Sequence, residues 1–179
     1  GLASGREKAK ELVRAGGVRI NGRPAAKPSL AVSPADEITV EAGLGQRYVG
    51  RGGYKLEKAL ELGASPAGKC CLDVGASTGG FTDCMIQNGA VKVYSVDVGT
   101  DQLDEKLRND PRVVSMEKTD IRNCVGSLPA VDFIGIDVSF ISLKLVLPSA
   151  YALLKNGGEC VALIKPQFEA GKSHLSKHG

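Results

Sequence analysis

The sequence has no run of eighteen consecutive apolar residues and no recognisable signal peptide. A transmembrane helix needs about twenty apolar residues to cross the bilayer core, and a secretory signal combines a basic start with a short apolar stretch. We therefore expect no stable membrane insertion and a cytoplasmic location. The first residue is Gly1 rather than methionine, so we expect the natural N-terminus to be missing.

Histidines are scarce, and the cysteines lack the spacing of a metal site. His174 and His178 are the only histidines, and both lie in a polar tail, which argues against a histidine-based metal site or catalytic triad. The five cysteines are odd in number and form no C-x-x-C pair, the spacing typical of zinc and redox sites. We expect no metal, and we interpret the cysteines as small buried residues in a reducing compartment. They are Cys70, Cys71, Cys84, Cys124 and Cys160.

Positive charge is concentrated in the first third of the chain. Residues 1–60 contain 11 Lys and Arg against 6 Asp and Glu, a net charge of +5, whereas the remainder has 12 against 14, a net charge of −2. This asymmetry indicates either a module that binds a polyanion or a solvated basic helix face. The charge alone leaves both interpretations open.

The first segment has the pattern of a small α+β module. Apolar residues at helical spacing predict a helix from Arg6 to Ala15, which a glycine pair ends. Asn21-Gly22 is a strong signal for a two-residue hairpin. A glycine-rich linker over residues 43–53 then separates this module from the rest of the chain. The expected strands are Val18–Ile20 and Glu37–Val40, and a helix over Tyr54–Leu62 follows the linker.

The second segment alternates strands with helices. This order predicts an α/β fold with a parallel sheet covered on both faces, in which ligands bind beyond the carboxyl ends of the strands. The residues that follow the expected strands are polar and should share this edge: Asp73, Asp97, Asp120, Asp137 and Lys165. The expected strands are Cys70–Val74, Lys92–Val96, Val113–Met116, Phe133–Ile136 and Cys160–Ile164. The expected helices are Phe81–Asn88, Asp101–Leu107 and Leu143–Leu154, with Asn156-Gly157-Gly158 as the stop before the last strand.

The turn after the first of these strands is the most informative stretch. Asp73 is followed by Gly75, Gly79 and Gly80, and glycines allow a backbone to approach a ligand closely. Asp97, after the next strand, can bind a ribose diol. The glycine spacing differs from the G-x-G-x-x-G fingerprint of dinucleotide sites. An acid at the end of the first strand, Asp73, suits the cationic methionine end of S-adenosylmethionine. We therefore favour S-adenosylmethionine over an NAD-like cofactor, and a turn that binds nothing is the third possibility.

The end of the fourth strand indicates which atom would be methylated. Asp137-Val138-Ser139-Phe140 lacks the proline pair used with exocyclic base amines, and no Pro-Cys pair offers the nucleophile of carbon-5 methylation. A hydroxyl oxygen fits best, and it must lose its proton as it attacks. A neutral lysine can take that proton, and burial and neighbouring cations favour the neutral form. We expect Lys165, after the apolar stretch 161–164, to be this base, with Lys55 as a second cation and Asp137 to orient Lys165.

Four motifs spread along the chain carry a family resemblance. They are Arg-Gly-Gly-Tyr-Lys-Leu-Glu-Lys-Ala-Leu from Arg51, Asp-Val-Gly-Ala-Ser-Thr-Gly-Gly-Phe-Thr from Asp73, Asp-Val-Ser-Phe-Ile-Ser from Asp137 and Ile-Lys-Pro-Gln-Phe-Glu from Ile164. Together they resemble the TlyA-type family, rRNA 2′-O-methyltransferases often labelled hemolysins. The stretch from Arg6 to Arg23 resembles the S4-type RNA-binding domain.

The resemblance implies two domains and their partners. Residues 54–179 would form a Rossmann-like, FtsJ-like S-adenosylmethionine-dependent methyltransferase domain, incomplete at its C-terminus. Residues 1–42 would form an S4-type domain, incomplete at its N-terminus, with ribosomal RNA or a ribosomal subunit as the partner. The FtsJ-type enzymes use a Lys-Asp-Lys-Glu tetrad, whose first three members match Lys55, Asp137 and Lys165. The tetrad glutamate would lie on a later strand, so we expect no counterpart in the sequence given, which ends at Gly179. Glu169 belongs to the lysine motif and does not take this place.

The same resemblance, with the residue patterns above, assigns the remaining contacts. Asp120 would accept a hydrogen bond from the adenine amine. The expected cofactor contacts are Asp73, Gly75, Ala76, Ser77, Gly79, Gly80, Phe81, Asp97, Asp120 and Ile121. The expected RNA contacts are Arg6, Lys10, Arg14, Arg19 and Arg23.

Two other functions stay open at this point. The chain could be an RNA-binding protein of the same fold without turnover, which an assay of methyl transfer to RNA would distinguish. It could also be a membrane-lytic protein, as the family label suggests, although the sequence has no strongly amphipathic membrane segment. Liposome leakage would test that possibility.

Overall fold

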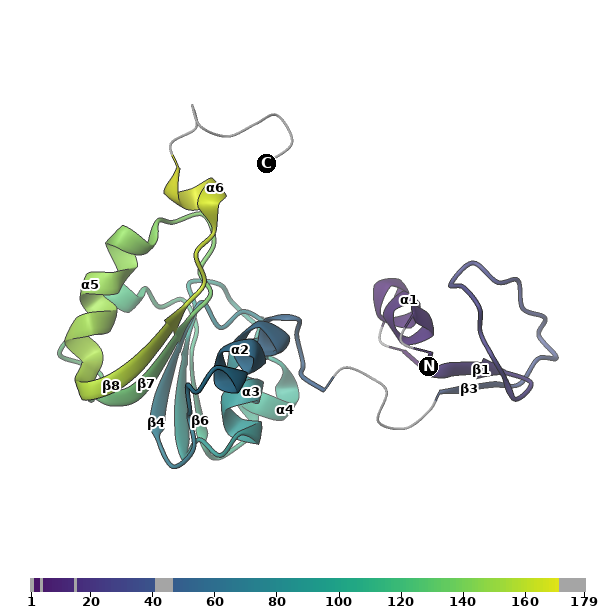
Figure 1. Ribbon diagram of the computed structural model, residues 1–179, viewed down its shortest axis with the longest axis horizontal. Helices are drawn as coiled ribbons and strands as arrows, with labels where there is room; N and C mark the ends of the chain where they lie inside the picture. Colours follow the sequence, from purple (N-terminus) through teal and green to yellow (C-terminus); the bar gives the residue numbers. More distant parts are fainter. Residues whose placement is uncertain (1, 4, 15, 41–46, 171–179) are drawn as a thin grey trace. The chain divides into compact units, whose positions relative to one another are not determined.

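The structure, a computed structural model, describes residues 2–3, 5–14, 16–40 and 47–170. It divides the chain into two compact units, Gly1–Arg47 and Tyr48–Gly179. Within the first unit, the helix packs on a three-stranded antiparallel sheet of order β2-β1-β3, around a small core of Leu12, Val18 and Ala25 (Figure 1). The elements of this unit are α1 (Arg6–Arg14), β1 (Val18–Ile20), β2 (Arg23–Pro24) and β3 (Ile38–Val40).

The hairpin predicted at Asn21-Gly22 is confirmed. Both residues have positive φ, 50° and 77°, as a type I′ turn requires, and Ile20 pairs with Arg23 across it. The Asn21 side chain also donates to Asp36 at 2.8 Å and accepts from the Glu37 amide at 2.8 Å. The turn residue therefore also anchors the segment that leads into β3.

The second unit is built on a five-stranded parallel sheet of order β6-β5-β4-β7-β8. The chain starts in the centre, runs outward to one edge, and returns to the centre to run outward to the other edge. The reversal lies between β4 and β7, and α/β sheets bind ligands at such a switch point. The strands are β4 (Cys70–Val74), β5 (Lys92–Val96), β6 (Val113–Met116), β7 (Val131–Ile136) and β8 (Leu154–Ala162).

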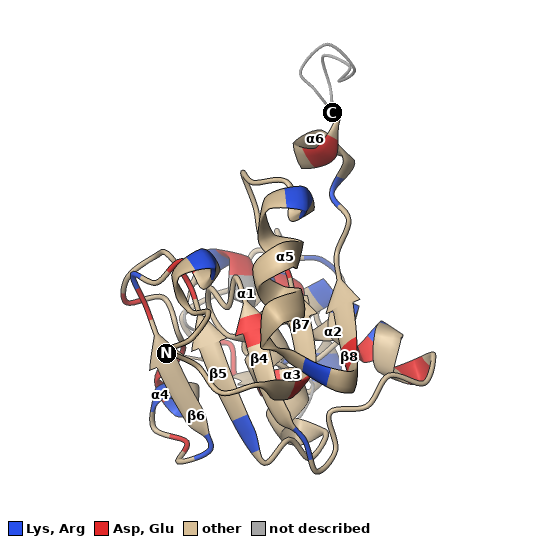
Figure 2. Ribbon diagram, turned by 90° about the vertical axis from the view of Figure 1, so that its left-hand side faces the viewer, with Lys and Arg blue, Asp and Glu red and all other residues tan. Residues whose placement is uncertain are grey.

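Helices cover both faces of this sheet. Figure 1 shows α5 on one face and α2, α3 and α4 on the other. Alternate residues of β4 point into the hydrophobic cores on the two faces of the sheet. Leu72 and Val74 pack in the core under α5, whereas Cys71 packs with Leu56 and Phe81 on the other face. The central strands are largely tan in Figure 2, so charges lie mainly at their ends and in the connections. The helices are α2 (Gly52–Glu61), α3 (Gly80–Gln87), α4 (Glu105–Arg108), α5 (Leu143–Leu153) and α6 (Pro166–Glu169), with a 3₁₀ turn at Ile121–Asn123.

Two helices begin two or more residues away from their expected starts. The helix expected over Asp101–Leu107 begins only at Glu105. The Glu117 carboxylate accepts hydrogen bonds from the backbone amides of residues 101, 102 and 103, which holds these residues outside the helix. The helix expected from Tyr54 begins earlier, at Gly52. Its first residues therefore come from the stretch expected to be linker; residues 43–46 of that stretch lie outside the described part of the chain.

The last strand also differs from expectation. It was expected over Cys160–Ile164, but β8 follows α5 directly and spans Leu154–Ala162, so the Asn-Gly-Gly stop lies inside the strand. The extra residues are accommodated by a register shift opposite β7 and by a φ of +77° at Gly157. Cys160 is exposed on this edge strand, whereas we expected a buried residue, and all five cysteines are free thiols.

Candidate active site

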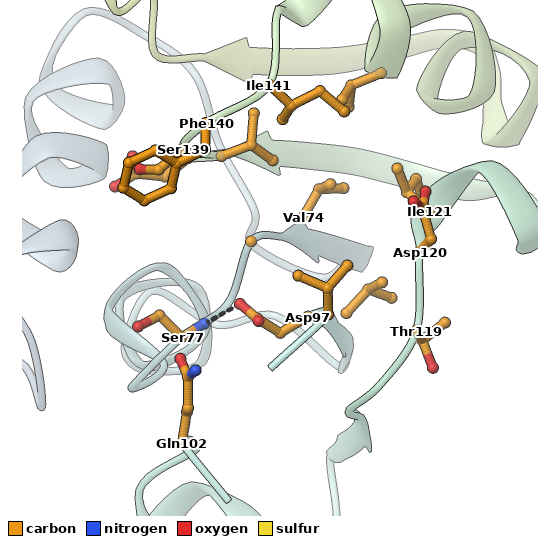
Figure 3. Close-up of a pocket in the computed structure, with 16 residues that line it drawn as sticks. Val74, Ser77, Asp97, Gln102, Thr119, Asp120, Ile121, Ser139, Phe140 and Ile141 are labelled. Carbon is orange, nitrogen blue, oxygen red and sulfur yellow. Dashed lines mark hydrogen bonds between the residues drawn. The ribbon is translucent and has the colours of Figure 1, made fainter. Parts of the chain in front are cut away.

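A cavity of about 340 Å³ opens at the carboxyl ends of β4, β5 and β7, within the usual range for a small-molecule site. Ser77 and Asp97 form its floor in the view of Figure 3, with Ser139 and Phe140 on one side and Asp120 and Ile121 on the other. Two of these strands, β4 and β7, flank the topological switch point. Asp97, Asp120 and Asp137, three of the four acids expected at this edge of the sheet, line the cavity.

The glycine-rich turn after β4 is shaped by close backbone contacts. Gly75 has a φ of +83°, and a β-carbon added there would lie 2.8 Å from the carbonyl oxygen of Asp137. Asp97 holds the turn from the other side, because its Oδ2 accepts from the Ser77 amide at 2.8 Å and its Oδ1 accepts from the Gly99 amide at 2.7 Å (Figure 3). Each carboxylate oxygen can accept a further bond, so Asp97 can hold the turn and a diol at once.

Asp73 lies beneath the turn rather than on the cavity wall. Its side chain is fully buried, and its Oδ2 accepts from the amide and the hydroxyl of Thr82 at 2.8 and 2.6 Å. Oδ1 has no hydrogen-bond partner among the described residues. Burial raises the pKa of this carboxyl to about 7, opposed by the Thr82 hydrogen bonds and reinforced by the nearby charges of Asp137 and Asp97.

The far wall of the cavity combines a buried apolar residue with an ion pair. Ile121 is buried, and Asp120 pairs with Arg122 at 2.6 Å. Hydrogen bonds from the Arg122 side chain and amide lower the pKa of Asp120, so this carboxylate is an acceptor at neutral pH. Gln102 reaches the cavity from the loop that Glu117 fixes.

A second cavity of about 570 Å³ adjoins the first and shares Gly75, Ser77, Asp137 and Ser139 with it. The two lysines expected to be catalytic both line it and meet on Asp137: Lys55 Nζ lies 3.1 Å from Oδ2 and Lys165 Nζ lies 2.6 Å from Oδ1. The Lys165 ammonium also donates to the Ser139 hydroxyl at 2.9 Å.

The surroundings of Lys165 differ in one respect from expectation. The apolar strand was expected to bury the root of its side chain, but β8 ends at Ala162 and Ile164 is 74% exposed. The Lys165 side chain is nevertheless only 19% exposed. Its contacts with Asp137 and Ser139, rather than the strand, hold it in the cavity.

Most of the site residues predicted from the sequence line one of the two cavities, but some do not. Gly79 does not line either cavity; a β-carbon there would meet the side chains of Leu107 and Leu103, so its role is in packing. Glu169 accepts from the Ser142 hydroxyl and the Leu143 amide at the start of α5, a capping role. The expected residues that do line the two cavities are Lys55, Gly75, Ala76, Ser77, Gly80, Phe81, Asp97, Asp120, Ile121, Asp137 and Lys165.

Several cavity residues were missed by the sequence reasoning. Phe140 lines the first cavity yet is 92% exposed, has a φ of +63° and contacts the Phe168 ring at 5.2 Å between centroids. A strained, exposed aromatic residue next to Asp137 could have been suspected only from its place in the motif. Arg51 likewise could have been suspected from its place at the start of a motif, whereas Gln102 carried no local signal.

The basic residues expected to contact RNA lie in the first unit. Arg6, Lys10 and Arg14 are spaced along α1, and Lys10 pairs with Glu7 at 2.6 Å. Arg19 lies on β1, where it donates to the Gly22 carbonyl, and Arg23 lies on β2. Arg6, Arg14 and Arg23 are exposed, so their guanidinium groups are accessible to phosphates.

The described residues offer neither a metal site nor a membrane span. No group of His, Cys, Asp and Glu in that part of the chain has the arrangement of a metal site. None of the helices within the same residues has the length and apolar character needed to cross a membrane.

Comparison with known proteins gives two family matches. The model of the FtsJ-like methyltransferases matches residues 48–179, and that of the S4 domain matches residues 1–38. The full chain is 50% identical to YqxC of Bacillus subtilis, named as an rRNA methyltransferase, and spans 65% of that protein. It is 46% identical to the 16S/23S rRNA (cytidine-2′-O)-methyltransferase TlyA of Mycobacterium tuberculosis and spans 68% of it.

A solved structure supports the same relationship. The hemolysin-labelled protein of Streptococcus thermophilus superposes with a TM-score of 0.71 at 48% identity, covering 98% of this chain and 66% of that one. The chain therefore spans about two thirds of the length of these relatives.

Proposed function

This chain belongs to the FtsJ-like methyltransferase family and has an S4 domain at its N-terminal end, and from that membership we propose that it methylates a ribose 2′-hydroxyl of ribosomal RNA with S-adenosylmethionine, in the cytoplasm. The observation that carries the proposal is the meeting of Lys55 and Lys165 on Asp137 beside the cofactor cavity. A hydroxyl acceptor needs a group that removes its proton, and a positioned lysine can do so.

The first cavity fits the cofactor in its volume and in its hydrogen-bond acceptors. S-adenosylmethionine, when bound, supplies the methyl group. Asp97 would accept from the ribose hydroxyls, and Asp120 beside the apolar Ile121 would accept from the adenine amine. The close approach at Gly75 leaves the turn without side-chain bulk where the methionine end would lie.

The second cavity fits the acceptor. Asp137 holds the two lysine nitrogens on its two oxygens, at 2.6 and 3.1 Å, so their separation and orientation are fixed before the RNA binds. Lys165, in its neutral form, would take the proton of the 2′-hydroxyl as the oxygen bonds to the methyl carbon. The bond between that carbon and the cofactor sulfur would break at the same time and leave S-adenosylhomocysteine. Lys55 would stabilise the developing negative charge on the oxygen.

Phe140 offers a surface for the base of the target nucleotide. An exposed aromatic ring beside the reacting residues can stack on any base, which is typical of RNA recognition. The first unit would supply affinity through Arg6, Arg14 and Arg23, whose charges suit phosphates.

The test is methyl transfer from radiolabelled S-adenosylmethionine to ribosomal RNA, followed by alkaline hydrolysis. A methylated 2′-oxygen cannot attack the neighbouring phosphate, so the label should appear in an alkali-resistant dinucleotide. Label recovered in free mononucleotides would place the methyl group on a base and refute the proposal. Binding of RNA without transfer of label would instead support an RNA-binding protein without turnover.

A further inference from the structure

The second cavity contains more positive charge than its own residues neutralise. Three cations line it, Arg51, Lys55 and Lys165, against one carboxylate, Asp137. Both lysines engage that carboxylate, whereas Arg51 is exposed and makes no ion pair within the described part of the chain. An exposed arginine that lines a polar cavity favours an anionic ligand.

The start of α2 adds to this positive potential. The helix begins at Gly52, next to Arg51, with no side chain capping it and no acidic residue in its first turn. The Asp137 carboxylate is the acid near this positive end of the helix dipole, since its Oδ2 would lie 3.6 Å from a β-carbon added at Gly52, and both lysines already engage that carboxylate. The start of α3 touches it, since a β-carbon added at Gly80 would lie 3.1 Å from the Gly52 Cα.

We propose that Arg51, together with the first turn of α2, binds the backbone phosphate next to the target ribose of the acceptor RNA. The inference rests on the proposed function. The 2′-hydroxyl and the 3′-phosphate are attached to adjacent carbons of one ribose, so a hydroxyl held at Lys165 brings that phosphate into the same cavity. The planar guanidinium fork matches two phosphate oxygens, and this contact would orient the hydroxyl toward the cofactor.

The methionine carboxylate of the cofactor is the competing anion for this site. It would be expected closer to Ser77 and Gly80, on the side of the cavity formed by the glycine-rich turn. The two anions make different predictions for an Arg51 variant, because one would weaken RNA binding and the other would weaken cofactor binding.

The experiment compares Arg51→Ala with a control that removes a similar charge elsewhere. Lys92 is exposed at the amino end of β5, the opposite end of the sheet, so Lys92→Ala is the matched control. Filter binding of radiolabelled ribosomal RNA measures affinity over a series of KCl concentrations. Calorimetry measures S-adenosylmethionine affinity for each variant.

Arg51→Ala should weaken rRNA binding about tenfold and reduce the slope of log affinity against log salt by about 0.7–0.9, with cofactor affinity unchanged. Lys92→Ala should leave the rRNA affinity, its salt slope and the cofactor affinity near those of the unaltered protein. Equal effects of the two variants on rRNA binding would overturn the proposal. Weakened cofactor binding with normal rRNA affinity would assign Arg51 to the methionine carboxylate instead.

A second variant probes the space at the start of α2. A β-carbon at Gly52 would meet its nearest protein atoms at 3.5–3.8 Å, so Gly52→Ala should fold normally but crowd a phosphate bound there. We expect a higher KM for rRNA with an unchanged affinity for S-adenosylmethionine, and an unchanged KM would contradict the site. Failure of the proposed function would look different: the unaltered protein would transfer no methyl group, while the Arg51 effect on rRNA binding could still be measured.

Discussion

Asp73→Asn should abolish a pH dependence of stability that a buried carboxyl imposes on the methyltransferase unit. Asp73 is fully buried, and the hydrogen bonds from Thr82 both go to Oδ2. An asparagine can place its amide oxygen there and keep both bonds. The variant therefore removes the titration of the group while it preserves the local hydrogen bonds.

The sign of the effect follows from the pKa of Asp73, which burial raises from 3.8 to about 7. The folded state holds this proton more tightly than the unfolded chain does. The stabilisation is therefore complete below about pH 3.8 and is lost as the pH rises through about 7. At 1.36 kcal/mol for each pKa unit, the full difference is at most about 4 kcal/mol, of which about 1.5–3 kcal/mol falls between pH 5 and pH 8.

Urea denaturation at several pH values measures this difference. The chain has no tryptophan and four tyrosines, and these lie at positions 48, 54, 94 and 151 of the second unit, so tyrosine fluorescence reports on the unit that contains Asp73. From pH 5 to pH 8, the free energy of unfolding of Asp73→Asn should rise by about 1.5–3 kcal/mol relative to that of the unaltered protein.

Asp132→Asn is the matched control. Lys155 lowers the pKa of Asp132, so its carboxylate is ionised in both states above pH 5. The difference between this variant and the unaltered protein should stay constant over the range. A constant difference for Asp73→Asn as well, or one that falls as the pH rises, would refute the reasoning.

Three further predictions concern ligand binding. Asp97→Ala, which removes the acceptor of the Ser77 and Gly99 amides, should weaken S-adenosylmethionine binding by about 1.5–3 kcal/mol in calorimetry, and unchanged affinity would contradict the cofactor site. Glu117→Ala should speed amide exchange at residues 101–103 and weaken cofactor binding, because three amides lose their acceptor; normal exchange would contradict the anchoring role. Deleting residues 1–42 should flatten the salt dependence of rRNA binding by about 0.9 for each phosphate that the protein no longer neutralises, and an unchanged slope would place the RNA surface elsewhere.

The fold class and the family could be predicted from the sequence. The relatives confirm the TlyA-type resemblance, and the parallel sheet confirms the α/β interpretation. Four strands, Val18–Ile20, Cys70–Val74, Lys92–Val96 and Val113–Met116, agree with expectation to the residue. Each is followed by a residue that strands disfavour, Asn21, Gly75, Asp97 or Glu117, so the local sequence indicates where each strand ends.

The differences arose where a distant residue decides the local structure. The short α4 depends on the Glu117 carboxylate, which follows another strand, and local propensity carries no trace of that contact. The early start of β8 depends on a register shift against β7. Asp73 was expected among the cofactor contacts because of its motif position, yet its side chain is fully buried beneath the turn.

Part of the site was predictable for a chemical reason. Acids and lysines that follow parallel strands must meet at one edge of the sheet, and this placed Asp137 and Lys165 together. Arg51 was not predictable in the same way, because it lies before a helix and not after a strand. Only the packing of α2 against α3 brings it to the cavity of the two lysines.

The most direct test of the account compares Lys165→Ala with Lys165→Arg in methyl transfer to rRNA. An arginine could keep the charge beside Asp137 and the donation to Ser139, but it cannot lose its proton to act as a base. Both variants should keep S-adenosylmethionine affinity within about threefold, roughly 0.7 kcal/mol, and both should lose about 10²- to 10⁴-fold in turnover. Near-normal methyl transfer by Lys165→Arg would show that the lysine is an electrostatic anchor and would contradict its role as the base.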